Sequence, residues 1–368
     1  MRRNNMNFKL WIIPILTLAV IAGLALFEPC LAPAGQVPST SGYKVLDPIR
    51  HGNLTVFPVV AATSHDTRGF ITLDEGLRSG EVVVTESGGV QPLVRRRPIR
   101  PIPPGGAQVN QLVLVNNSKR PLILLAGEIV TGGKQDRVIG KDRIVPAESD
   151  PIDLSVFCVE PGRWTGTSAK FDSLGTAMAQ PAVRAKAMSD KDQAKVWSEV
   201  GKARDSIAAT LPAPAAAPVR ETSSYARVMQ NVEVQQKVDS VAEPIQHSYQ
   251  SLIRQLRDQN AVGAVVAVNG QIVWADIFAS TSLLEKYWPK LVRSYAAEAV
   301  VTKAKGREVD VKSAQEFLNN MEGRHETVES EPGLYRHTEI AGDGFKAFEL
   351  TSLLPKTGFD VHVAKMAE

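Results

Sequence analysis

The sequence predicts an α+β fold, with an antiparallel, β-rich core (meander or sandwich-like) and helices from the middle of the chain packed on it. Between residues 108 and 160, short apolar runs alternate with turn residues such as Asn116-Asn117. A hairpin is expected at Asn269-Gly270, because this dipeptide tolerates the positive φ angles of a tight turn. Residues 170–207 and 222–258, in contrast, are predicted to be helical, the second with apolar side chains at helical spacing.

The first predicted elements are two strands with a short helix between them. Leu54 to Ala61 is almost wholly apolar and predicts a strand, in which Pro58 marks an edge or a bulge. Thr72 and Glu75 have the spacing of a capping box, in which each side chain bonds the other residue's backbone amide, so a helix should begin there. Glu81 to Thr85 predicts the next strand.

The middle of the chain predicts helices separated by a proline-rich segment. Residues 170–207 and 222–258 are expected to be helical, the second amphipathic and broken near Pro244. Between them, residues 208–220 are rich in Pro and Ala and are expected to be extended and exposed.

The last part of the chain predicts a return to β-structure. Residues 264–278 form the expected hairpin, and Ser282 with Glu285 repeats the capping-box spacing. This second capping box should open a helix that Pro289 kinks. The chain is then expected to close with a helix near 312–321 and strands at 335–351 and 360–364.

The N-terminus has the three parts of an export signal. A basic start precedes an uncharged apolar run, residues 10–27, and Ala32-Pro33-Ala34 predicts cleavage before Gly35. The apolar run is also long enough to span a bilayer, so an uncleaved anchor in the inner membrane is the alternative. We therefore expect residues 1–34 to be a signal peptide or anchor and the protein to be periplasmic or secreted.

Beyond the signal, residues 35–44 are expected to be a linker and residues 45–365 a single domain. Removing residues 1–34 takes away three basic residues and one acid, which lowers the formal net charge from +3 to +1. A chain with so small a net charge has no electrostatic field that would attract nucleic acid or an anionic membrane surface. Contact with a membrane is expected only through residues 10–27, if they remain.

Cysteine and histidine usage gives no sign of a metal or cofactor. Once the signal is removed, Cys158 is the only cysteine, which excludes an intramolecular disulfide and a zinc site built on cysteines. The strand-like context of Cys158 favours a buried core residue over a reactive thiol. The six histidines show no metal-binding spacing. We therefore expect neither a metal nor a cofactor, although ligands dispersed along the chain leave no such spacing.

Several short segments resemble one bacterial family: Asn53–Pro58, Leu73–Glu75, Leu125–Glu128, Gly132–Arg137, Pro146 and Cys158–Trp164. This is the ARG and rhodanese-phosphatase-superfamily-associated protein domain, and the resemblance covers most of residues 45–365. The family implies no assigned activity. Its name records a genomic association with ADP-ribosylglycohydrolases and rhodanese-type phosphatases, which does not indicate a mechanism. An export signal does not fit an association with cytoplasmic enzymes, so a nucleotide or ADP-ribose role is not expected.

The densest polar cluster lies at a Gly-rich turn and consists of Glu128, Lys134, Gln135, Asp136 and Arg137. It is not a phosphate-binding loop, because Glu128 stands where the first glycine of that motif would be and Gln135 follows the lysine. In a functional interpretation, Lys134, Gln135 and Arg137 bind an anionic ligand while Glu128 or Asp136 acts as acid or base. In a structural interpretation, these charges pair across the strands of a hairpin.

A second cluster, Glu160, Arg163 and Trp164, follows a predicted strand. Trp164 can stack on a ring or a sugar, and Arg163 can clamp a carboxylate or a phosphate. The structural alternative is a Glu–Arg pair covered by a half-buried indole.

Two classes of function remain open on the sequence. The first is an exported binding or scaffold protein of the cell envelope, which we favour because no nucleophile, base and orienting group can be recognised together. The second is a hydrolase or transferase that uses both clusters to act on an anionic or sugar-bearing small molecule.

Overall fold

The structure, a computed structural model, describes residues 42–87, 107–302, 308–331, 333–354 and 358–368. These residues belong to one compact unit. Antiparallel sheets with helices packed on them make up this unit, which confirms the predicted α+β class. The predicted signal segment lies outside the described residues.

The largest sheet has nine strands within the described residues, in the order β1-β3-β13-β14-β18-β17-β16-β15, and β2 also pairs with β3. Each of its strand pairs is antiparallel. Its strands are β1 (Tyr43–Val45), β2 (Ile49–His51), β3 (Leu54–Ala61), β13 (Asn260–Val268), β14 (Gln271–Phe278), β15 (Gly323–Glu331), β16 (Tyr335–Gly342), β17 (Phe345–Ser352) and β18 (Phe359–Ala367).

Pro58 does not mark an edge, because β3 has neighbours on both sides, and the register shift of the β3–β13 pair lies on β13, between Ala261 and Gly263. Its carbonyl accepts a hydrogen bond from Leu46 N at 2.8 Å, at the break between β1 and β2. In a strand, the nitrogen and the oxygen of one residue point to the same side. The missing N–H of Pro58 therefore faces that break, where no ladder hydrogen bond is lost.

The predicted hairpin is present as β13 and β14. Asn269 and Gly270 have φ angles of 51° and 75°, the left-handed values that a type I′ turn requires. This turn places Trp274, Asp276 and Phe278 of β14 on one face of the sheet, because successive side chains alternate between faces.

Two smaller sheets make up a second β-layer, built from residues 71 to 173. The six-stranded sheet has the order β12-β8-β9-β11-β6-β5, and the three-stranded sheet has the order β10-β7-β4, in which β4 and β7 run parallel. The strands are β4 (Ile71–Thr72), β5 (Val82–Thr85), β6 (Gln111–Asn116), β7 (Leu122–Leu124), β8 (Ile129–Gly132), β9 (Arg137–Ile139), β10 (Arg143–Val145), β11 (Ile152–Cys158) and β12 (Phe171–Ser173).

Helix α2 (Leu73–Ser79) begins at the predicted capping box. Thr72 Oγ1 accepts a hydrogen bond from Glu75 N, and Thr72 N donates one to Glu75 Oε2. The remaining helices are α3 (Pro181–Ala185), the π-helix η3 (Lys186–Asp190), α4 (Gln193–Ala209), α5 (Ala213–Glu221), α6 (Tyr225–Gln230), α7 (Val232–Gln255), α8 (Thr281–Val301) and α9 (Val311–Asn319).

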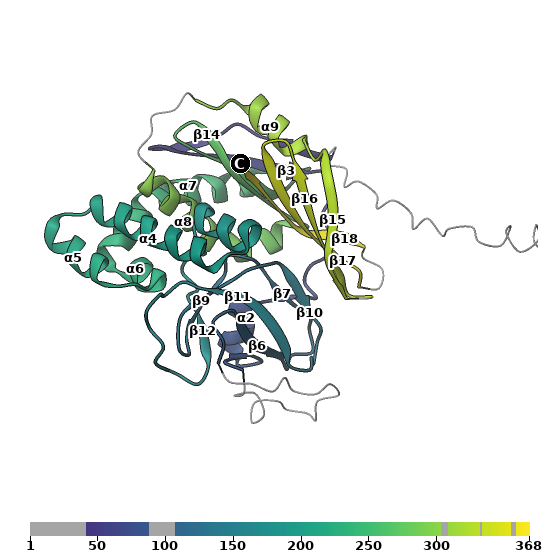
Figure 1. Ribbon diagram of the computed structural model, residues 1–368. Helices are drawn as coiled ribbons and strands as arrows, with labels where there is room; N and C mark the ends of the chain where they lie inside the picture. Colours follow the sequence, from purple (N-terminus) through teal and green to yellow (C-terminus); the bar gives the residue numbers. More distant parts are fainter. Residues whose placement is uncertain (1–41, 88–106, 303–307, 332, 355–357) are drawn as a thin grey trace, which may run out of the picture. The chain divides into compact units, whose positions relative to one another are not determined.

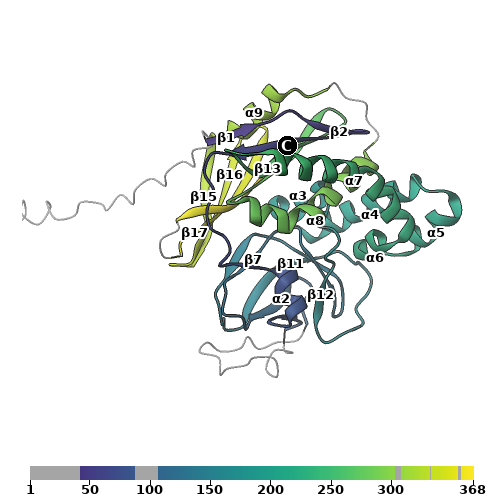
Figure 2. The same ribbon diagram turned by 180° about the vertical axis from the view of Figure 1, so that it is seen from behind.

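Helices α7 and α8 lie between the large sheet and the smaller sheets (Figures 1 and 2). One hydrophobic core joins all three layers and includes Val266 of β13, Ile123 of β7 and Leu291 of α8. Helix α9 packs on the other face of the large sheet through Ala314 and Leu318. The helices from the middle of the chain thus pack on the β-structure as predicted.

The Pro/Ala-rich segment 208–220 is helical rather than extended, which corrects the prediction. Pro212 caps α5 and Pro214 stands in its first turn, where a backbone N–H has no intrahelical partner to lose. Alanine is the best helix former, and Ala216 and Val219 are buried while most of the segment is exposed. Helical propensity and a small apolar face therefore outweigh the proline content.

Two further local predictions were wrong. Helix α7 runs through Pro244 without a break. The cap of α8 is Ser280, whose Oγ accepts from Leu283 N, and not Ser282. Serine stands at both 280 and 282, so spacing alone did not decide which one begins the helix.

Among the helices of the described residues, none combines the length and the apolar character that crossing a bilayer requires.

Candidate ligand-binding site

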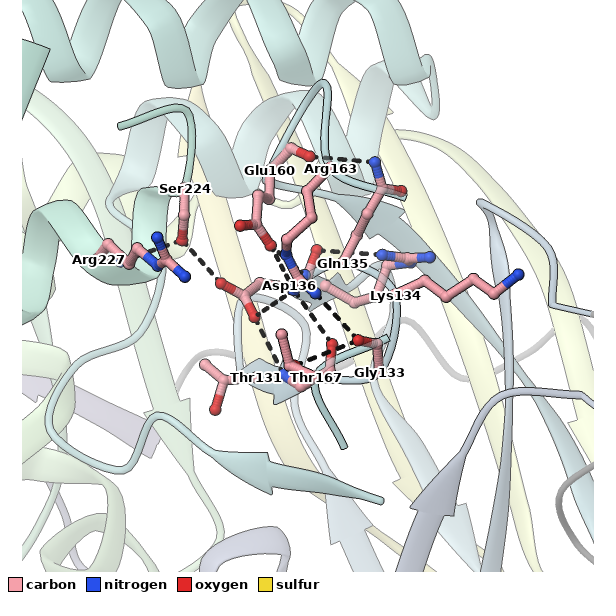
Figure 3. A network of polar contacts seen from close by, with 12 residues as sticks. Thr131, Gly133, Lys134, Gln135, Asp136, Glu160, Arg163, Thr167, Ser224 and Arg227 are labelled. Carbon is pink, nitrogen blue, oxygen red and sulfur yellow. Dashed lines mark hydrogen bonds and ion pairs between the residues drawn. The ribbon is translucent and has the colours of Figure 1, made fainter. Parts of the chain in front are cut away.

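Asp136, Glu160 and Arg163 from the two predicted clusters meet beside the turn between β8 and β9 (Figure 3). Arg163 Nη2 lies 2.6 Å from Glu160 Oε2 and 3.5 Å from Asp136 Oδ1. The backbone N of Asp136 donates to Glu160 Oε2 at 3.1 Å. One guanidinium thus pairs with two carboxylates.

The turn that brings Asp136 to this place depends on two glycines. Gly132 and Gly133 have φ angles of 125° and 49°. A Cβ atom at Gly133 would lie 2.2 Å from the ring of Phe171, so no larger residue fits there. The geometry of the Gly-rich turn is therefore structural.

Arg163 is held by the protein itself. Besides the two carboxylates, its guanidinium donates to the carbonyls of Gly133 at 3.0 Å, Thr165 at 2.8 Å and Gly132 at 3.3 Å. The hydrogen bond to Glu160 raises the pKa of Arg163 above its ordinary value. These contacts occupy both Nη groups, so the side chain braces the turn and is not available as an anion clamp.

Ser224, which the sequence did not single out, completes this network. It precedes α6, and its Oγ accepts from Arg227 N at 3.1 Å and donates to Asp136 Oδ2 at 2.7 Å. Burial raises the pKa of the Asp136 carboxyl. Asp136 therefore links α6 to the β8–β9 turn, although 88 residues separate it from Ser224.

An open groove of about 900 Å³ lies between this turn region and the helices α5 and α6. On one side it is lined by Glu160, Arg163 and Trp164, and on the other by Arg227, Gln230 and Asn231. The Trp164 indole is 43% exposed, although it is a large apolar group. Lys134 Nζ lies 4.9 Å from the centroid of this ring, so this predicted ligand residue is brought to Trp164.

Glu128 does not belong to this site. It is 2% exposed, and its carboxylate is paired with Lys290 of α8, which also binds Asp74 at 2.8 Å. Burial raises the pKa of Glu128, and the Lys290 ammonium works against this rise. The sequence analysis grouped Glu128 with the Gly-rich cluster because they are neighbours in the chain, but the Glu128 side chain pairs with Lys290 of α8 instead.

Gln135 and Arg137 are also buried rather than open to the groove. Gln135 Nε2 donates to the Glu160 carbonyl at 3.1 Å. Arg137 is 0% exposed, and its Nη groups reach the carbonyls of Asp136 and Gln108 only at 3.4 Å. Burial lowers the pKa of Arg137.

A second polar network lies in the core and was missed by the sequence analysis. Arg184 of α3 binds Asp276 through two hydrogen bonds, at 2.8 and 2.9 Å. His362 lies between Asp276 and Asp142, with its ring nitrogens 3.1 and 2.5 Å from their carboxylates. Tyr295 also donates to Asp276. The five side chains are at most 1% exposed, so this network joins elements of the fold and cannot meet a substrate.

The Arg184 side chain lies directly against a glycine. A Cβ atom at Gly127 would come within 2.7 Å of it, and Gly127 has a φ angle of 93°. The one signal for this network in the sequence is the position of Asp276 in its strand. Trp274 and Phe278 face the core on either side of it, so an acid between them must have a partner.

Cys158 is buried, as predicted. Its Sγ accepts a hydrogen bond from Glu160 N at 3.3 Å, and burial raises the pKa of the thiol. Within the described residues, no three His, Cys, Asp or Glu side chains are grouped so as to hold a metal ion.

Comparison with known families agrees with the resemblance noted in the sequence. The sequence model of the ARG and Rhodanese-Phosphatase-superfamily-associated Protein domain matches residues 42–365. The chain belongs to this family. No curated protein and no solved structure matches it. The family match spans the turn, the groove and the buried network, so these are features of a member of the family rather than of an added segment.

Proposed function

We propose that the chain is an exported binding protein of the cell envelope, and that the groove between Trp164 and α6 takes up an anionic, ring-bearing small molecule. The observation that carries this proposal is that the charged side chains of the site are bound to one another, whereas the aromatic side chain is exposed. Arg163, Glu160 and Asp136 are held by one another, whereas the indole of Trp164 is exposed beside them. An exposed aromatic ring on a fixed support is typical of a binding surface.

Catalysis is the weaker alternative, because the acid and the base that it needs are not assembled. Glu128 is paired with Lys290 away from the groove. Asp136 accepts hydrogen bonds from Ser224 and from Gly132 N, which fix its carboxylate in the structure. Binding requires only the exposed face of the groove, and the held network supplies a rigid wall for it.

Export rests on the N-terminal signal, and the proposal includes cleavage before Gly35. Mass spectrometry of the protein from an envelope fraction should find Gly35 as the first residue. An intact Met1 in the membrane fraction would instead support the anchored alternative, and recovery from the cytoplasm would contradict export.

A thermal-shift screen of the purified chain against small anions, sugars and nucleotides tests the binding function. A ligand that binds the folded state alone raises the apparent melting temperature. The same ligand should lose at least ten-fold in affinity for Trp164→Ala, while Arg254→Gln, at an exposed position of α7, should bind it normally. A ligand that binds Trp164→Ala as tightly as the native chain would place the site elsewhere.

A further inference from the structure

Trp164 lines the groove and is 43% exposed. The ammonium of Lys134 lies 4.9 Å from the ring centroid, but Lys134 does not line the groove. Figure 3 shows the Lys134 side chain extending away from Arg227, which lies on the opposite wall. Lys134 therefore supports the ring from outside the groove. The rest of the ring offers an apolar, electron-rich face on which a flat ring or the C–H face of a sugar can stack.

The groove also offers hydrogen-bonding groups that the fold does not use. Glu160 lines the groove although it is only 3% exposed, and its Oε2 accepts from Asp136 N and pairs with Arg163, which leaves Oε1 without a hydrogen-bond partner among the described residues. The side chains of Gln230 and Ser223 likewise have no hydrogen-bond partner in the described part of the chain. A carboxylate oxygen, an amide and a hydroxyl around an aromatic ring together suit a ligand that carries several hydroxyl groups.

Charge within the groove decides where a negative group of the ligand can lie. Asp136 and Glu160 both pair with the guanidinium of Arg163, so this wall offers no free cation for a negative group of the ligand. On the opposite wall, Arg227 and Glu221 are both exposed, and the Arg227 guanidinium has no ion-pair partner among the described residues. Its planar donors suit a carboxylate. Hydroxyl groups are thus favoured beside Glu160 and a carboxylate beside Arg227.

We infer that the groove binds an acidic saccharide, whose ring stacks on Trp164, whose hydroxyls bond Glu160 and whose carboxylate pairs with Arg227. This inference rests on the proposed binding function and names its ligand class. The groove, at about 900 Å³, lies near the upper end of the ~300–1,000 Å³ range of small-molecule sites. It therefore has room for more than one sugar ring.

The test is an array of oligosaccharides that carry uronate, sialate or muramate residues, each beside its neutral counterpart, with citrate as an anion that is not a sugar. Calorimetry of the purified chain should then show at least ten-fold tighter binding of an acidic saccharide than of its neutral counterpart. Citrate should not bind. Equal affinity for the acidic and neutral forms would overturn the role of Arg227.

Two substitutions separate the parts of the site. Arg227→Gln should reduce the affinity for the acidic saccharide to that for its neutral counterpart, and it should leave the neutral affinity unchanged. Trp164→Ala should weaken both at least ten-fold, while Trp164→Phe should recover part of the loss. Both positions are exposed, so circular dichroism should show intact folding.

The inference and the proposed function fail in different ways. If no acidic saccharide binds, but the thermal-shift screen finds another ligand that Trp164→Ala loses, the ligand class is wrong and the binding function stands. A nucleotide that stacks on Trp164 would be such a result. If neither experiment finds a ligand of this groove, both proposals are wrong.

Discussion

His362 Nδ1 lies 2.5 Å from Asp142 Oδ2, although 220 residues separate the two in the chain. Both side chains are 0% exposed. His362 belongs to β18 of the large sheet, and Asp142 follows β9 in the smaller one. Burial alone would lower the pKa of His362, but the Asp142 and Asp276 carboxylates raise it to about 9. An imidazolium between two carboxylates therefore joins the two β-layers.

The raised pKa of His362 predicts a loss of stability in mild alkali. The folded state holds the proton up to about pH 9, and the unfolded chain releases it near the ordinary value of 6.5. The contribution of His362 is thus fully present below pH 6.5 and is lost as the pH rises through 9. Its size is of order 3 kcal/mol in the free energy of unfolding.

Urea unfolding between pH 6 and 10 measures this contribution. His362→Gln should be less stable than the native chain at pH 6, and the difference should shrink towards pH 10. The matched control is His247→Gln, because His247 is exposed on α7 and lies outside the buried network. A difference between native chain and His362→Gln that stays constant with pH would show that the histidine is neutral when folded.

Arg184→Met should destabilise the fold by about 3–5 kcal/mol, because it removes the guanidinium that pairs with buried Asp276 and leaves only His362, which Asp276 shares with Asp142. The measurement is the free energy of unfolding in urea at pH 7. Arg254→Met, which replaces an exposed arginine of α7, should cost less than about 1 kcal/mol. A small effect of Arg184→Met would mean that His362 and Tyr295 suffice to hold the Asp276 carboxylate.

The sequence predicted the elements that local chemistry determines. The Thr72–Glu75 capping box and the Asn269-Gly270 turn are both present, because each depends on residues within one turn of the chain. Predictions failed where the same residue type is compatible with different secondary structures in different surroundings. A proline is compatible with a central strand at Pro58 and with a helix at Pro244, and only the neighbouring elements decide this.

The site was predictable in part for the same reason. Asp136, Glu160 and Arg163 were proposed from short motifs, and they do meet. The motifs could not show that backbone carbonyls of the β8–β9 turn bind Arg163, nor that Ser224 joins the network from the start of α6. Those contacts arise from the packing of α6 on the β8–β9 turn, which leaves no periodic signal in the sequence.

Glu128→Gln tests whether the acid that the sequence singled out is structural. It removes the charge that pairs with Lys290, which keeps only Asp74 as its partner. We expect the free energy of unfolding to fall by about 3 kcal/mol and the affinity for any ligand of the groove to stay within two-fold. A stable variant that loses its ligand would place Glu128 in the binding site instead.

Asp136→Asn should loosen α6 without unfolding the protein. An asparagine oxygen can still accept from Gly132 N, but the amide nitrogen cannot accept the hydrogen that Ser224 donates. The loss of one buried hydrogen bond costs about 1–3 kcal/mol, and the cost falls where α6 is fastened to the turn. Hydrogen exchange should therefore become faster in Tyr225–Gln230, while exchange in α7 stays unchanged.

Asp205→Asn, on the exposed face of α4, serves as the control. Equal protection of α6 in both variants would show that its packing on the helices alone, and not Asp136, sets the position of this wall of the groove.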